Sequence, residues 1–512
     1  MSNAPDTALV ETSAVELRRL IGTRELSPVE LLEACIERIE HLNPYVNAIT
    51  ATCYERARSE ARAAEAAVMR GESLGLLHGL PLGVKDLENT QGLLSTLGTP
   101  RLRNHVPSAD NELVARLRRA GAIVVGKTHV PEMGAGANSR NPVWGATGNP
   151  FNPNLNAGGS SGGSAAALAL DLLPLCTGSD TGGSLRIPAA KCGVVGFRPS
   201  PGVVPSVRKS LGWSPISVVG PMGRNVADAC LQLAATAGPH PGDPLSYPLD
   251  AMAFMRPPPV DLSRLRVAWT EDFGLCDVDP LVRRAMREKI SAMKHLFASC
   301  EEVSFDLGDA HRCFDILRAE AFVAGMRAAY EADAGSLGPN PRSNYEMGAR
   351  MSLLDAAWAQ AEQTRIVQRF QRVFADHDIV LSPTTPVSPF PWTQPCAAAI
   401  DGRPQDNYYR WLALTYVVTL TTHPAISLPC GRDEKHMPFG LQVTGRFRGD
   451  LALLATSQAL EQAFERHPAL RRPRPDPARL SMADPRLDSI VTAAPDDVHA
   501  HQPNDGLQTS VV

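Results

Sequence analysis

Apolar residues at helical spacing predict a run of helices at the start of this chain. Ser13 and Ser27 each precede such a series, and each is followed three residues later by a glutamate, which is the pattern of a capping box. An Ala-, Arg- and Glu-rich stretch over Tyr54–Met69 predicts a third helix. Later helices are predicted at Asn111–Arg119, at Asn225–Ala237 and from Asp450 to Arg466.

Short apolar runs lie between these helices and predict strands. Strands that alternate with helices favour a parallel or mixed sheet covered by helices, so we expect an α/β fold. The predicted strands are Leu80–Val84, Ala122–Val125, Leu173–Thr177, Arg266–Trp269, Ile379–Leu381 and Ala425–Leu428.

The chain divides into a long patterned part and a short unpatterned one. We expect residues 1–467 to form one domain, with a mostly helical region from Cys276 to Phe374 beside the sheet. Residues 468–512 are rich in Pro, Asp and Arg and have little periodicity, which predicts a disordered C-terminal tail.

Composition and charge narrow the class of protein. Lys and Arg total 50 against 54 Asp and Glu, and a net charge of −4 argues against a general nucleic-acid or membrane-surface binder. No stretch approaches the roughly 18 apolar residues of a membrane helix, and the N-terminus lacks the pattern of a signal peptide. The 10 cysteines are scattered, without the spacing of a zinc site or disulfide framework. We therefore expect a cytoplasmic α/β enzyme.

Two glycine-rich turns are candidates for binding an oxyanionic group. Gly158–Ser164 leads into an Ala-rich helix start, and Gly178–Arg186 follows the predicted strand Leu173–Thr177, where α/β enzymes place catalytic groups. Ser184 in the second turn, with successive N–H groups beside it, has the features of a nucleophile and an oxyanion hole. An ordinary strand-to-helix turn capped by Ser184 explains the same spacing equally well.

A lysine stands at the end of the predicted strand Leu80–Val84. Burying an ammonium group is costly, so Lys85 in this position is unusual. Burial would lower the pKa of Lys85 toward neutrality and make it a general base. The alternative is a surface ion pair between Lys85 and Asp86.

These three segments together resemble the amidase signature family. That family has a lysine after Gly-Ile or Gly-Val, then GGSSGGS, then DTGGS followed by an apolar residue, Arg, any residue and Pro. Here these are Lys85, residues 158–164, and Asp180–Ser184 with Arg186 and Pro188. The two family serines, at 160 and 184, lie 24 positions apart, as the family requires. The resemblance covers roughly residues 13–466 and includes GVVGFRP at 193–199 and PAISLP at 424–429.

The resemblance implies a fold and a mechanism. The fold is an α/β/α sandwich around a large mixed sheet, and the activity is amide hydrolysis through an acyl-enzyme at Ser184. Ser160, after a cis peptide bond from Gly159, would relay protons to neutral Lys85, and a desolvated lysine is a suitable base for this step. No metal or cofactor is needed. The implied oxyanion hole comprises the N–H groups of Thr181, Gly182, Gly183 and Ser184.

The substrate pocket is less defined by these motifs. We expect substrate contacts from Met133, Gly158, Gly159 and Trp213, in a fairly apolar pocket for an aryl or alkyl amide. Other expectations concern residues around the site. Trp144 and Phe322 are further pocket candidates, although such residues are more often plain core. We expect Asp180 and Arg186 to hold the second turn, Gln442 to pack or form hydrogen bonds, and His423 to be structural or to line the pocket.

Two other motif matches are misleading. Gly121–Thr128 fits the P-loop string, but Ala122–Val125 is strand-like and Pro131 would interrupt a following helix. Residues 158–162 fit the G-x-S-x-G elbow, which needs a strand directly before the serine, whereas residues 149–154 are predicted to form a loop.

Other functions stay open. The glutaminase subunit of the tRNA-dependent amidotransferase has the same core, although residues 199–222 resemble free-standing amidases more. A non-catalytic binding or scaffold protein is disfavoured because Lys85, Ser160 and Ser184 are all present. The same nucleophile would also cleave activated esters. The expected partner is a small-molecule amide, with no nucleic acid and no membrane. Homodimers are common in the family, but the residues do not decide the oligomeric state.

Overall fold

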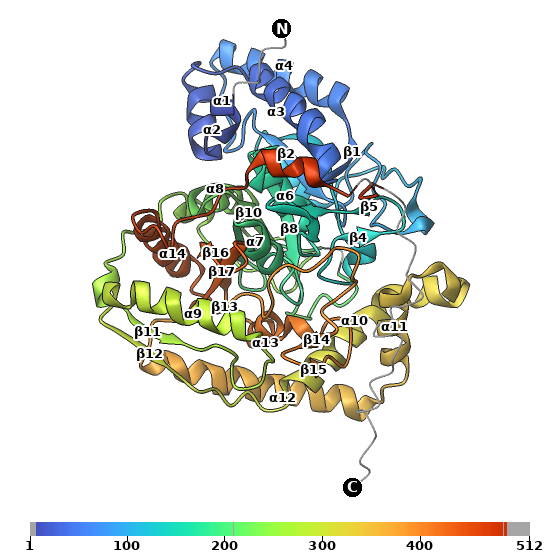
Figure 1. Cartoon of the computed structure of the whole chain (residues 1–512). Helices are drawn as coiled ribbons and strands as arrows, with labels where there is room; N and C mark the ends of the chain where they lie inside the picture. The colour runs from blue at the N-terminus through green and yellow to red at the C-terminus, as the bar shows by residue number, and fades with distance from the viewer. Residues whose placement is uncertain (1–6, 208, 485, 489–512) are drawn as a thin grey trace.

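An eleven-stranded mixed β-sheet runs through the centre of the molecule (Figure 1). The computed structural model describes residues 7–207, 209–484 and 486–488. In sheet order, the strands are β1 (Ile49–Thr52), β3 (Ile123–Thr128), β2 (Pro81–Lys85), β8 (Leu175–Asp180), β10 (Val218–Gly223), β9 (Val195–Arg198), β16 (Ala425–Arg432), β17 (Pro438–Thr444), β13 (Ile379–Pro383), β11 (Arg266–Trp269) and β12 (Ser299–Glu302).

Parallel and antiparallel pairs both occur in this sheet. β3, β2 and β8 run parallel to one another, as do β13, β11 and β12, and the strands between these two groups pair antiparallel. Because β2 and β8 are parallel neighbours, their carboxyl ends, Lys85 and Asp180, lie at the same edge of the sheet.

The six predicted strands are all present. Most of them extend past the predicted end, because backbone pairing continues into polar and glycine residues such as Gly178–Asp180. β9, β10 and β17 were not predicted from the sequence, although they form the middle of the sheet. Each of them carries glycine, and β10 and β17 also carry proline, so their local strand propensity is weak. β9 and β10 pair with strands well separated in the chain, whereas β17 pairs with its sequence neighbour β16 and with β13.

The predicted helices begin at the expected caps. The Ser13 hydroxyl accepts from the Glu16 N–H at 3.2 Å, and Asn111 and Asn225 cap their helices in the same way. The helices are α2 (Ala14–Gly22), α3 (Pro28–Leu42), α4 (Tyr54–Arg70), α5 (Glu112–Arg119), α8 (Val226–Thr236) and α14 (Asp450–Glu465).

Helices cover both faces of the sheet. A Cβ atom on Gly196 of β9 would lie 2.8 Å from the Ala189 Cβ, so only glycine allows α7 (Arg186–Cys192) to approach so closely. Gly196 pairs with Met222 of β10, and the next residue, Gly223, faces α8 on the other side. The result is the three-layer α/β/α sandwich, with α7 pressed onto the middle of the sheet.

A helical layer lies along the lower side of the molecule in Figure 1. It corresponds to the predicted helical region, and its α10 packs against both α11 and α12. Met326, Leu337 and Tyr345 form a separate apolar cluster there, to which Met133 and Phe322 add. The layer therefore has a small core of its own next to the site described below. The helices of this layer are α10 (Ala310–Ala332), α11 (Pro339–Ala349) and α12 (Leu353–Gln371), whereas α9 (Pro280–Met293), also in the predicted helical region, contacts β13 of the sheet.

The start of the predicted tail is ordered. Leu470, Leu480 and Leu487 are each at most 2% exposed, and the Leu487 carbonyl accepts from the Ala146 N–H at 2.7 Å. The prediction of disorder from residue 468 is therefore wrong for residues 468–484 and 486–488, because three leucines spaced along this segment pack into the body. Residues 489–512, also part of that prediction, lie outside the described residues.

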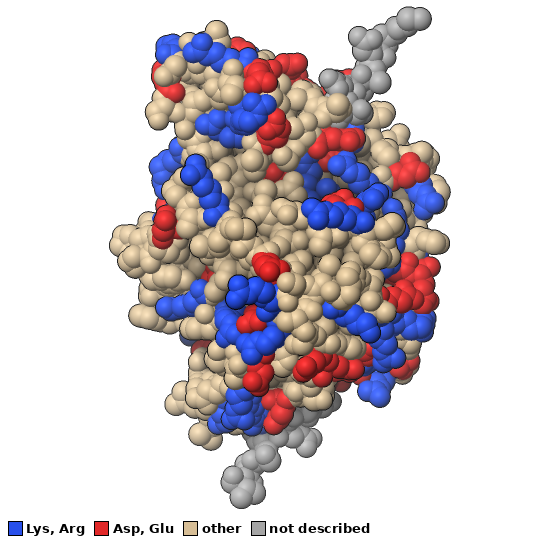
Figure 2. Space-filling model, turned by 90° about the vertical axis from the view of Figure 1, so that its left-hand side faces the viewer, with Lys and Arg blue, Asp and Glu red and all other residues tan. Residues whose placement is uncertain are grey.

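Charged side chains are mixed on the surface. On the face in Figure 2, basic and acidic residues are interspersed rather than gathered into one large patch.

The 10 cysteines are free thiols, and most are buried. Within the described part of the chain, no helix combines the length and apolarity required to cross a membrane.

The packing of the C-terminal segment can be tested with one substitution. Leu480→Ala should lower the free energy of unfolding by about 2–3 kcal/mol, because it leaves a cavity at a side chain that is 1% exposed. The matched control Leu353→Ala, at a side chain 84% exposed, should change it by less than about 0.5 kcal/mol. Urea denaturation measures both, and equal effects would contradict the packing described here.

Candidate active site

Lys85 ends strand β2 in a completely buried position. Its side chain is 0% exposed, and its backbone N–H donates to the Thr177 hydroxyl of β8 at 2.8 Å. Asp86 turns away from Lys85 and accepts from the N–H and hydroxyl of Thr96. The surface ion pair considered from the sequence is therefore wrong, and the buried lysine is confirmed.

The Lys85 amine lies between two serine hydroxyls. Lys85 Nζ donates to Ser160 Oγ at 2.7 Å and to Ser179 Oγ at 2.8 Å. Desolvation lowers the pKa of Lys85 to about 7, although the negative charges of Glu88 and Asp180 act in the opposite direction. A sizeable fraction of this lysine is thus neutral near pH 7, with a lone pair available to accept a proton.

The first glycine turn brings Ser160 to this lysine. The Gly159–Ser160 peptide bond is cis, as the family resemblance implies, and Gly158 has a φ of +78°. The turn leads into α6 (Gly162–Ala169), and the Ser161 N–H donates to the Ser184 carbonyl at 3.3 Å. This bond ties the first turn to the second.

The second glycine turn connects β8 to α7 and is built around Asp180. The Asp180 carboxylate accepts from the Gly183 N–H at 2.9 Å and from the Leu185 N–H at 3.2 Å. The Gly183 N–H is therefore occupied, and its predicted place in an oxyanion hole is not supported. The N–H groups of Thr181, Gly182 and Ser184 have no acceptor among the described residues.

Two arginines fix Asp180 in turn. Arg186 donates twice to the carboxylate, at 2.9 and 3.0 Å, and Arg198 donates to it at 3.2 Å and to the Asp180 carbonyl at 2.6 Å. Burial alone would raise the pKa of Asp180, but these two guanidinium groups hold it well below its usual range. Asp180 and Arg186 thus have the turn-holding geometry that the sequence predicts, and Gln442 accepts from Arg186 at 2.7 Å.

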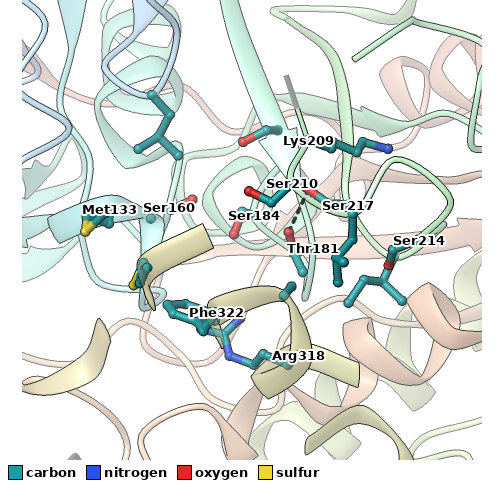
Figure 3. A pocket seen from close by; sticks show the side chains of 17 residues that line it. Met133, Ser160, Thr181, Ser184, Lys209, Ser210, Ser214, Ser217, Arg318 and Phe322 are labelled. Atoms are coloured by element: carbon teal, nitrogen blue, oxygen red, sulfur yellow. Dashed lines mark hydrogen bonds between the residues drawn. The ribbon is translucent and has the colours of Figure 1, made fainter. Parts of the chain in front are cut away.

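A cavity of about 280 Å³ opens in front of both turns (Figure 3). Ser160 and Ser184 both line it, close to one another in the view of Figure 3. One part of the wall is polar, with the hydroxyls of Ser179, Thr181, Ser210, Ser214 and Ser217. The other part is apolar, with Leu87, Met133, Ile216, Phe322 and Met326.

The predicted pocket residues divide into two groups. Met133 and Phe322 line the cavity. Trp213 does not, because the loop that carries it turns the indole outward and leaves it 77% exposed. Trp144 also lies elsewhere, with its Nε1 donating to the Thr96 hydroxyl at 2.9 Å. Gly158 and Gly159 shape the first turn rather than the cavity wall, so the substrate contacts predicted for them and for Trp213 are not supported.

The misleading motifs have structural explanations. Within the P-loop string, Ile123–Thr128 forms the fully buried strand β3, and Lys127 donates to the Thr90 hydroxyl at 3.0 Å. The loop predicted over residues 149–154 is instead a short hairpin of β6 (Gly148–Asn149) and β7 (Asn152–Asn156), outside the main sheet. His423 is buried against Phe370 and Phe374, with one ring nitrogen 2.7 Å from the Gln371 side-chain oxygen, consistent with a structural role.

Several residues that line the cavity were missed from the sequence, among them Ser179, Lys209 and Arg318. Ser179 was the one with a usable pattern, because it directly precedes Asp180 in the second turn. Lys209 lies in an irregular loop, and Arg318 lies on α10, about 130 positions after the second turn. Neither has a local motif, so only the folded chain brings them to the cavity.

Comparison with known proteins agrees with this geometry. A model of the family described as Amidase matches residues 30–454. An acylamidase from Rhodococcus erythropolis is 33% identical over 455 residues, covering 88% of this chain and 94% of the relative. A glutamyl-tRNA(Gln) amidotransferase subunit from Azoarcus sp. is 34% identical over 497 residues, covering 91% of this chain and 100% of the relative.

The fold is shared with a solved enzyme of the same kind. The crystal structure of a bacterial aryl acylamidase of the amidase signature family matches with a TM-score of 0.82 and 27% identity, covering 92% of this chain and 98% of that chain. The sheet, the paired glycine-serine turns with their buried lysine, and these similarities lead to one conclusion: this chain belongs to the amidase signature family of amide-hydrolysing enzymes.

Proposed function

We propose that this enzyme is a free-standing amidase that cleaves the C–N bond of a small aryl or alkyl amide through an acyl-enzyme at Ser184. The observation that carries the proposal is the 2.7 Å hydrogen bond between Lys85 Nζ and Ser160 Oγ, beside a cavity that Ser184 also lines. A serine hydroxyl is a weak nucleophile at neutral pH and needs an adjacent base. The desolvated Lys85, joined to the cavity through Ser160, meets that need.

The proton path uses both serines. As Ser184 Oγ adds to the amide carbonyl carbon, its proton passes to Ser160 Oγ, and the Ser160 proton passes to Lys85 Nζ. The relay then runs in reverse and protonates the leaving nitrogen, the C–N bond breaks, and the acyl group remains on Ser184. Water repeats the sequence against the acyl-enzyme and releases the carboxylate.

The negative charge that develops on the carbonyl oxygen requires hydrogen-bond donors. The N–H groups of Thr181, Gly182 and Ser184 are suited to this role because no described residue competes for them. The Thr415 hydroxyl holds the turn from behind by donating to the Gly182 carbonyl at 2.6 Å. A donor set that is rigid before substrate arrives lowers the barrier without reorganisation.

One alternative is that the chain acts as the glutaminase subunit of an amidotransferase, a function that the Azoarcus relative raises. Free glutamine carries an ammonium group that a carboxylate would normally bind. Among the described residues lining the cavity there is no Asp or Glu, whereas Arg318 and Lys209 are present. This charge pattern, together with the apolar wall, favours an amide without an ammonium group.

Removal of the nucleophile is the first test. Ser184→Ala should reduce kcat on an aryl amide such as an anilide by several powers of ten. The matched control is Ser161→Ala, a buried neighbour whose hydroxyl has no hydrogen-bond partner among the described residues, and its kcat should stay within about threefold of wild type. Equal loss in both variants, or activity retained in Ser184→Ala, would contradict the assignment of Ser184.

The dependence of kcat/KM on pH below neutrality should follow the protonation state of Lys85. Below a pKa of about 7 the amine is protonated and cannot accept the proton from Ser160, so kcat/KM should rise with pH and level off above about 7. A series of kcat/KM measurements from pH 5 to 9 tests this. The Lys209→Met variant should keep this rise of kcat/KM with pH, because Lys209 lines the cavity without bonding to either serine. The residual activity of Lys85→Met should no longer show the rise.

A substrate panel separates the two amidase functions. The purified chain alone, without tRNA or a second protein, should release aniline or ammonia from aryl and alkyl amides and leave glutamine intact. Colorimetric assay of the released amine provides the measurement, with Ser184→Ala as the blank. Release of ammonia from glutamine alone would overturn the free-standing amidase in favour of the amidotransferase function.

A further inference from the structure

Arg318 presents an uncompensated positive charge to the active-site cavity. It lies on α10 and lines the cavity, yet only 6% of the residue is exposed. Its Nε donates to the Asn344 side-chain oxygen at 3.1 Å, and its Nη2 donates to the Tyr408 hydroxyl at 2.6 Å. Both acceptors are neutral, and Nη1 has no acceptor among the described residues.

The nearest acidic residue on the same helix already has partners. Asp315, one turn before Arg318, accepts from Arg410 at 2.7 Å and from the Tyr409 hydroxyl at 2.8 Å. No carboxylate among the described residues lies within 4 Å of the Arg318 guanidinium nitrogens. A guanidinium group that is largely removed from water and lacks an anion is unfavourable, so an anionic ligand at this point would gain a strong interaction.

The surroundings hold the guanidinium in one place. The rings of Phe322 and Tyr409 each lie 4.9 Å from the guanidinium carbon, and the ring of Tyr408 lies 5.6 Å away. Asn344, the acceptor for Nε, is itself fixed because it donates to the Asn340 carbonyl at 2.7 Å. A charge that is already oriented loses little freedom when it binds a ligand.

The other cation at the cavity has a different orientation. Lys209 lies on the opposite side of the cavity from Arg318 in Figure 3, and its ammonium points away from Ser184. It also lines a neighbouring, more acidic cavity with Asp110 and Glu112. Arg318 is therefore the better placed of the two to meet a group attached to an amide bound at Ser184.

We propose that Arg318 binds a carboxylate of the substrate, so that this enzyme prefers amides whose acyl or amine part carries a carboxylate. This inference rests on the proposed amidase function at Ser184 and defines the substrate class within it. The remaining donors of Nη1 and Nη2 would contact the carboxylate, and the apolar wall with Met133 and Phe322 would contact the carbon skeleton.

The test compares matched pairs of substrates that differ in one charge. Glutaranilic acid is paired with 5-methylhexananilide, and 4-acetamidobenzoate with 4-isopropylacetanilide, so that a branched alkyl group replaces the carboxylate at similar size. In at least one pair, wild-type kcat/KM should be about tenfold or more higher for the carboxylated member. Arg318→Met should lower that ratio about tenfold, whereas Lys209→Met should preserve it.

Two further variants and a melting curve protect this test from a folding artefact. Thermal unfolding should show that Arg318→Met keeps its fold. If it does not, Tyr408→Phe, which removes the acceptor of Nη2, should lower the same ratio severalfold, whereas Tyr330→Phe, outside the cavity lining, should preserve it. A wild-type ratio near one in both pairs would overturn the proposal. A ratio that Lys209→Met abolishes and Arg318→Met retains would also overturn it.

The failure of this inference is distinguishable from failure of the proposed function. Hydrolysis of the neutral substrates that depends on Ser184, without any preference for a carboxylate, would overturn the role of Arg318 alone. Hydrolysis that persists in Ser184→Ala would overturn the proposed mechanism, whatever the ratio of kcat/KM between the carboxylated and the neutral substrates.

Discussion

The site depends on the removal of Lys85 from water. An ammonium group in this position would face neutral hydroxyls and the ends of two buried strands, so burial favours the neutral amine. The cost of that burial is limited because the amine keeps two hydroxyl partners, Ser160 and Ser179. The same desolvation that makes the lysine unusual as a structural residue makes it useful as a base. The parallel pairing of β2 with β8 places it beside the second glycine turn.

Asp180 is also buried, but its charge has close partners. Whereas Lys85 is left without a close counter-ion, Asp180 accepts from two arginines and two backbone amides. A buried carboxylate with this many donors stays ionised and rigid. Its rigidity passes to the turn that carries Ser184, because the Gly183 and Leu185 N–H groups on either side of this serine both bond to Asp180. One buried charge thus shapes the turn, and one buried amine is held beside it in the state that the proposed proton relay requires.

The core and the helical layer contribute different sides of the cavity. The glycine-serine turns and Lys85 come from the sheet and α6, whereas Arg318, Phe322 and Met326 come from α10. The layer containing α10 packs partly through its own apolar cluster.

The sequence by itself determined the α/β class, six strands, the capped helices and the three motif segments, because each of these depends on residues close together in the chain. Tertiary structure alone decided the rest. Lys85 and Ser179 meet through the pairing of β2 with β8, Ser160 joins them from the first glycine turn, and β9 and β10 form against strands well separated in the chain. Trp213 is exposed and Arg318 lines the cavity for the same physical reason. The exposure of a side chain depends on what the fold places next to it, and this cannot be deduced from the residues nearby in the sequence.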